Sequence, residues 1–138
     1  MLQSFPLLAL SFIVYALITM LSPANPARPW YQNESMAISL NSGDVWHISM
    51  GDLFIGFSFG LFFIELLRST RAGRASIMNH GLSVIVFVGA LLTFTAVKGY
   101  GNSIFFMFTV MTFTDFLVGF VITTATARRD VAIGRASE

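Results

Sequence analysis

Hydrophobic residues dominate four stretches of the chain, and polar residues gather in the connections between them. The apolar stretches cover about residues 2–21, 48–67, 77–97 and 103–126. A hydrocarbon layer about 30 Å thick needs about 20 apolar residues in a helix that rises about 1.5 Å per residue. Backbone groups find no water in lipid, so stretches of this kind form helices. The pattern predicts an all-α integral membrane protein with four transmembrane helices.

The connections arrange residues 1–138 as one membrane domain, folded as an up-down antiparallel bundle. An external loop covers residues 22–47, a cytoplasmic loop covers 68–76, and a cytoplasmic tail covers 127–138. The first stretch contains no basic residue, and prolines follow it where a signal peptide would need small residues for cleavage. We therefore expect it to be a retained span. The last two stretches are joined so tightly that their helices should be antiparallel neighbours.

Basic residues are divided unequally between the two sides of the membrane. Six arginines belong to the second connection and the tail: Arg68, Arg71, Arg74, Arg128, Arg129 and Arg135. The other side holds Arg28 and Lys98. Lysine and arginine accumulate in cytoplasmic loops, so both termini are expected in the cytoplasm. The expected location is a bacterial inner membrane, crossed several times.

The external loop carries a pattern typical of a β-hairpin. Residues 35–40 and 45–50 alternate between apolar and polar, and turn-forming residues 41–44 separate them. We expect a short hairpin on the outer membrane surface, with an irregular loop as the alternative. Trp30 and Trp46 lie at the ends of this segment, where their rings favour the headgroup layer.

Composition supports a membrane protein and removes several classes of function. Hydrophobic residues make up 55% of the chain and charged residues 11%, against about 25% charged in soluble domains. A net charge of +1 gives no reason to expect nucleic acid as a partner. The chain has no cysteine, no phosphate-binding glycine loop and no zinc-binding or nucleophile motif. We therefore expect no enzymatic activity, no metal and no cofactor.

The most unusual residue is Asp115, which lies near the middle of the fourth span. A charge there costs about 2.5–3.5 kcal/mol on insertion scales, so its presence needs a reason. Thr112, Asp115, Gly119 and Thr123 fall on one helical stripe that should face other helices or a wet cavity. The stripe is either an ion or proton site in a transport path, or a hydrogen-bonded contact between helices. No second acid is expected at its depth, which favours the contact.

A second polar group is expected at the cytoplasmic interface. Glu65 lies near the inner end of the second span with Arg68 three residues later, and His80 opens the third span. Together with Arg128 these residues predict an interfacial cluster that fixes two helices. The alternative is that His80 acts as a pH-sensitive switch or proton relay.

Two glycines mark a helix-packing face on the second span. Gly56 and Gly60 are four residues apart, the spacing that lets two helix backbones approach closely in a membrane. The partner helix can belong to this chain or to another one.

These features favour a structural or accessory subunit, or an assembly factor, that packs in the bilayer against other membrane proteins or as a homo-oligomer. The alternative is a small proton- or cation-coupled transporter or channel that uses Asp115. In length and span count the chain resembles the small multidrug-resistance exporters, which dimerise to build a path. That family carries its essential glutamate in the first span, whereas the first span here has no acid. A lipid- or quinone-interacting accessory ranks third.

Overall fold

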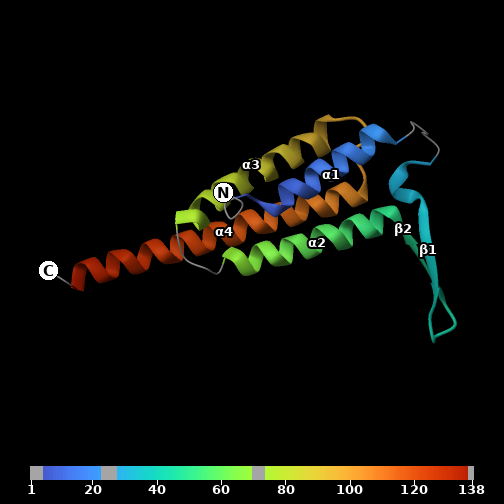
Figure 1. The fold of residues 1–138 in the computed structure, drawn as a ribbon. Coiled ribbons are helices and arrows are strands. Elements are labelled where there is room, and N and C mark those ends of the chain that lie inside the picture. Colours follow the sequence, from blue (N-terminus) through green and yellow to red (C-terminus); the bar gives the residue numbers. More distant parts are fainter. Residues whose placement is uncertain (1–4, 23–27, 70–73, 137–138) are drawn as a thin grey trace.

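The computed structural model describes residues 5–22, 28–69 and 74–136, with side chains at 5–22, 28–68, 81–122 and 124–125. This part of the chain forms four α-helices and one two-stranded antiparallel sheet (Figure 1). The elements in chain order are α1 (Leu7–Leu21), the 3₁₀ helix η2 (Trp30–Gln32), β1 (Glu34–Ser39), β2 (Val45–Ser49), α2 (Met50–Ser69), α3 (Arg74–Ala96) and α4 (Ser103–Ala136). The mostly helical fold and the hairpin in the first connection are confirmed.

Two helices within the described residues are long and apolar enough to cross a membrane. They are Met50–Arg68 in α2 and Ser103–Ile122 in α4. Leu7–Leu21 and Gly81–Ala96 are also apolar but shorter. The prediction of four spans is thus confirmed in part. Helix α4 also continues to Ala136, through most of the segment expected to be a separate tail.

The order in which the helices pack is not the order of the chain. Helix α1 packs on α2 and α3, while α4 packs on α3 and α2. The contact between α3 and α4 agrees with their short connection. However, α2 and α4 run in the same direction and are direct neighbours (Figure 1). A simple up-down ring would place α3 beside α2, so this packing brings together buried positions of α2 and α4 that sequence order keeps apart.

An aromatic cluster around Tyr15 joins α1 to the rest of the bundle. The Tyr15 ring is fully buried, and its centroid lies 4.7 Å from that of Phe105, 5.0 Å from Phe54 and 5.1 Å from Trp30. Trp30, for which we expect the level of the headgroup layer, is buried among protein side chains, and its Nε1–H donates to Thr19 Oγ1 at 3.0 Å. The indole therefore packs in the core.

Asn102 connects the same cluster to the start of α4. Its Oδ1 accepts from the backbone N–H of Phe105 at 3.0 Å, which caps the helix. Its Nδ2 donates to the Tyr15 hydroxyl at 2.9 Å. One side chain thus satisfies a helix terminus and a buried phenol.

The hairpin passes into α2 without a loop. Ser49 and Asp52 cap the helix reciprocally: Ser49 N–H donates to Asp52 Oδ2 at 2.8 Å, and Asp52 N–H donates to Ser49 Oγ at 3.1 Å. The N–H of Met50 donates to the carbonyl of Asn33 at 2.8 Å, which ties the base of β1 to the same point. At the far end Gly43, with φ of +92°, closes the turn. The orientation of the hairpin is therefore fixed to α2.

Replacing Gly51 with alanine is expected to lower the free energy of unfolding by about 1–3 kcal/mol. A Cβ at this position would lie 2.8 Å from the backbone oxygen of Tyr31 and 2.9 Å from Ile104, so η2 would have to move. Denaturant titration in detergent micelles, followed by circular dichroism, measures the loss. The matched control is Gly81→Ala in α3, where a Cβ meets nothing within 4 Å. Equal stability of the two variants would contradict this packing.

Candidate functional site

The interior of the bundle contains a set of buried polar side chains, here named the interior polar set. Each is 5% exposed or less, and they come from all four helices. The set consists of Ser11, Ser58, Glu65, Ser83, Thr109, Thr112 and Asp115. Large apolar side chains are exposed on the outside of the same helices, among them Phe59, Leu92 and Phe120. Polar groups inside and apolar groups outside is the distribution expected of a bundle surrounded by lipid.

The predicted stripe of α4 faces the interior. Asp115 is 3% exposed, and Thr112 and Gly119 are also buried. The Thr112 hydroxyl donates to the carbonyl of Thr109 at 2.7 Å, so this hydroxyl is bonded within its own helix. The side chain of Thr123 lies outside the described residues. The stripe thus presents its carboxyl group to the other helices, away from the outer surface.

Glu65, which is expected in the cluster at the cytoplasmic interface, is buried inside the bundle. It is 1% exposed, and its Oε2 accepts from the backbone N–H of Leu8 at 3.1 Å. Leu8 is in the first turn of α1, whose N-cap is Pro6, a residue that makes no side-chain cap. Glu65 therefore caps α1 from a different helix. The reason is tertiary: α1 begins beside the inner end of α2, which no local pattern in the sequence reveals.

The predicted interfacial cluster also includes Arg68, His80 and Arg128. Arg68 is half-buried. The side chains of His80 and Arg128 lie outside the described residues. Helix α2 packs on α1 and α4, so the expected pairing of α2 with α3 is not a main contact of the fold.

Glu65 and Asp115 are both buried, and their positions along the bundle can be compared through two rings that touch. The rings of Phe54 and Phe108 mark equal depth on α2 and α4, with centroids 5.8 Å apart. Glu65 lies eleven residues beyond Phe54 and Asp115 seven beyond Phe108. At about 1.5 Å per residue, the two positions differ by about 6 Å along the bundle, roughly one helical turn.

Two buried serines extend the polar interior between the acids and the aromatic cluster. Ser11 and Ser58 are fully buried, and their hydroxyls have no hydrogen-bond partner within the part of the chain that the structure describes. Ser11 precedes Tyr15 by one turn and Ser58 follows Phe54 by one turn, and those two rings are in contact. Both serines therefore lie about one helical turn from the aromatic cluster, on its side toward the acids. Sequence reasoning missed them, although their spacing from these aromatic residues was a usable signal.

The glycine pair of α2 points away from the bundle. Gly56 and Gly60 are exposed, and a Cβ at either would meet nothing within 4 Å. Within the described residues, no other helix of this chain uses the predicted packing face.

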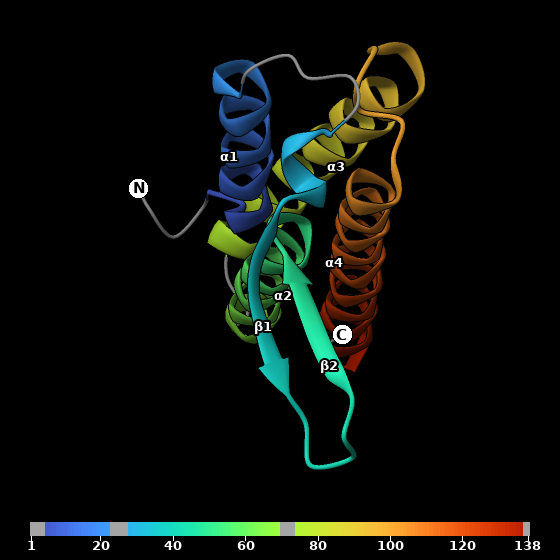
Figure 2. The ribbon, with the colours of Figure 1, turned by 90° about the vertical axis from the view of Figure 1, so that its right-hand side faces the viewer.

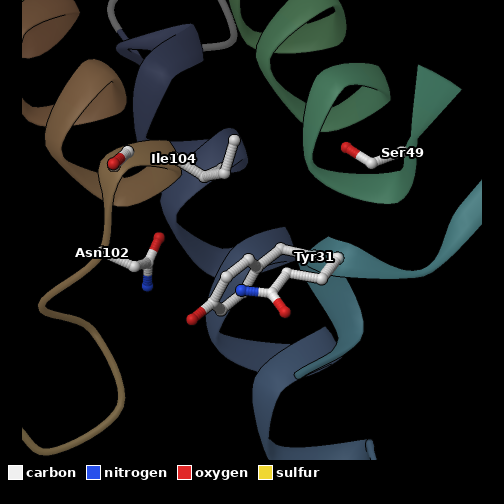
Figure 3. A pocket seen from close by; sticks show the side chains of 6 residues that line it. Tyr31, Ser49, Asn102 and Ile104 are labelled. Carbon is white, nitrogen blue, oxygen red and sulfur yellow. The ribbon is translucent and has the colours of Figure 1, made fainter. Parts of the chain in front are cut away.

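A shallow depression of about 460 Å³ lies at the end of the bundle that carries the hairpin. Figure 3 shows Tyr31 from η2, Ser49 from the end of β2, and Asn102 and Ile104 from the start of α4 around it. Gln32 and Ser103 complete the lining. None of the six carries a carboxylate, an imidazole or an amine. The depression therefore offers hydroxyl and amide groups that can form hydrogen bonds.

Among the described residues, no group of three or more histidine, cysteine or acidic side chains could hold a metal ion. The chain matches no protein-family model, no curated protein and no solved structure. The features of the molecule that bear on function are the interior polar set, the outward glycine pair and the hairpin.

Proposed function

We propose that the protein is a small polytopic membrane protein that acts as a structural or accessory subunit, or as an assembly factor. It packs in the bilayer against other membrane proteins or against a second copy. The main support is the outward face of α2, where Gly56 and Gly60 leave a strip of backbone open. Such a strip lets a second helix approach closely, and close approach is the principal source of helix association in lipid.

The membrane assignment extends to all four helices. It is supported by the apolar outer surface and by the two helices that are long enough to span. Helix α1 begins and α4 ends at the same end of the bundle (Figure 1). Arg68 near the end of α2, Arg74 at the start of α3 and the arginines at the end of α4 belong to helix ends at this side, so by the positive-inside rule we assign it to the cytoplasm. The proposed location is a bacterial inner membrane with both termini cytoplasmic.

Replacing Gly60 with isoleucine is expected to weaken association at least about tenfold, equal to about 1.4 kcal/mol. The fold should persist because the new side chain meets open space within the chain. Native mass spectrometry of protein extracted in mild detergent measures which species remain. The matched control is Gly81→Ile, since Gly81 is also exposed and a Cβ there also meets nothing within 4 Å. A native protein that is monomeric without any co-purified partner would contradict the proposal.

A second candidate function is a proton or cation path that includes Asp115. The observation that favours it is the pair of buried acids about one turn apart, followed by the unpartnered hydroxyls of Ser11 and Ser58. Carboxyl and hydroxyl groups in series are the groups that carry protons or coordinate small cations inside membrane proteins.

The variant Asp115→Asn is expected to reduce proton flux to background if this path exists. Flux is measured with a pH-sensitive dye enclosed in proteoliposomes. Asp44→Asn is the control, because Asp44 is exposed in the hairpin turn and far along the chain from the interior polar set. Equal flux through the native protein and Asp115→Asn would remove this candidate.

A further inference from the structure

The hairpin has one apolar face and one mixed, mainly polar face. Its register pairs Met36 with Ile48 and Ile38 with Trp46, so these four side chains lie on the same side of the sheet. Most of this face is open, and Trp46 is 53% exposed. The opposite face carries Glu34, Ala37, Ser39, Val45 and His47, with the His47 Nδ1 2.9 Å from Glu34 Oε1. Such a hairpin needs another surface to cover its apolar face, because two strands alone are marginally stable in water.

The apolar face is buried at the end of the hairpin that meets α2 and open farther out. In Figure 1 the hairpin extends roughly across the direction of α2. Figure 2 looks onto the end of the bundle, where the sheet is seen face-on and no other element lies in front of β2. Ile48, which lies two residues before the start of α2, is only 7% exposed. Met36, Ile38 and Trp46 share the face of Ile48 and continue it outward beyond the bundle.

We infer that this face lies in the outer leaflet of the surrounding bilayer, at the boundary between headgroups and acyl chains. The inference depends on the proposed membrane location of the helices. The position of the hairpin along the bundle agrees with this placement. Strand β2 ends at Ser49, and the apolar helix α2 begins at the next residue. The first turns of α2 also expose apolar residues, namely Leu53 and Phe57.

The chemistry of the hairpin favours the interfacial layer over the hydrocarbon interior. A two-stranded sheet leaves both outer edges unpaired, and those backbone groups require the water of the headgroup region. Tryptophan is the residue that this layer prefers. Residues 30–50 include neither lysine nor arginine, so apolar contact holds the hairpin to the membrane without attraction to anionic lipid. The hairpin thus acts as a lateral arm that fixes the rotation and depth of α2.

The absence of cysteine from the chain permits a direct test with single-cysteine variants. Ile38→Cys and Ser39→Cys place a nitroxide label on adjacent residues of opposite faces. Each labelled protein is reconstituted in phosphatidylcholine vesicles, with and without phosphatidylglycerol. Electron paramagnetic resonance then compares collisions with oxygen, which concentrates in lipid, and with a water-soluble nickel chelate. We expect the label at residue 38 to favour oxygen and the label at residue 39 to favour nickel, equally in both vesicles.

Two results would overturn the inference. Nickel accessibility at both residues would place the arm in water, and a label at residue 38 shielded from both reagents would place it against another protein molecule. A third variant, Phe59→Cys on the exposed side of α2, separates these failures from failure of the membrane assignment. If residue 59 favours oxygen while residue 38 does not, the inference about the hairpin is wrong and the membrane assignment of the helices is retained. If residue 59 favours nickel, the membrane location itself is wrong.

Discussion

Replacing Tyr15 with alanine is expected to lower the free energy of unfolding by about 3–5 kcal/mol, the range found when a large buried aromatic side chain is truncated. Tyr15 is fully buried among rings from η2, α2, α4 and the connection before α4. Its removal leaves a cavity where these elements meet. Titration with a denaturing detergent, monitored by circular dichroism, measures the change.

The variant Tyr15→Phe separates the ring from its hydroxyl. It keeps the packing and loses the hydrogen bond from Asn102 Nδ2, which also donates to the carbonyl of Gly99 at 3.2 Å. The expected loss is about 1 kcal/mol. If phenylalanine proved as damaging as alanine, the hydroxyl rather than the aromatic contacts would organise this end of the bundle.

Replacing Glu65 with alanine is expected to cost about 1.5–3 kcal/mol, because the Leu8 N–H would lose a buried acceptor. The effect should be concentrated at the start of α1. Hydrogen exchange measured by NMR at the Leu8 amide should become faster, together with a fall in global stability.

Glu65→Gln keeps an oxygen that accepts the same bond and should retain most of the protection. Glu34→Ala removes a glutamate from the exposed hairpin and should change stability by about 0.5 kcal/mol or less. Unchanged exchange at Leu8 in Glu65→Ala would show that Glu65 does not cap α1.

Local patterns were sufficient for several parts of the fold. The alternating runs predicted the hairpin. Its strands need only an alternation of apolar and polar residues, and its turn needs a glycine at positive φ. The short segment after α3 gave the contact between α3 and α4. Both features are encoded in short segments of consecutive residues.

Contacts between distant segments were not predictable in the same way. Glu65 lies near the end of an apolar stretch, which is the usual place of an interfacial glutamate, and its burial depends on where α1 begins. Trp30 follows prolines in a polar loop, yet it is buried because it donates a hydrogen bond to Thr19 and packs against the Tyr15 ring. The contact between α2 and α4 depends on how the pair α1–α2 packs against the pair α3–α4. Hydrophobic periodicity does not specify which helices of the two pairs become neighbours.

The claim on which the account depends is that lipid surrounds these helices. The most direct measurement is to wash membranes from cells that express the protein with alkaline carbonate and to follow the chain by immunoblotting. We expect the protein to remain in the membrane pellet and to be released by detergent. Recovery of the folded protein in the carbonate supernatant would contradict the account.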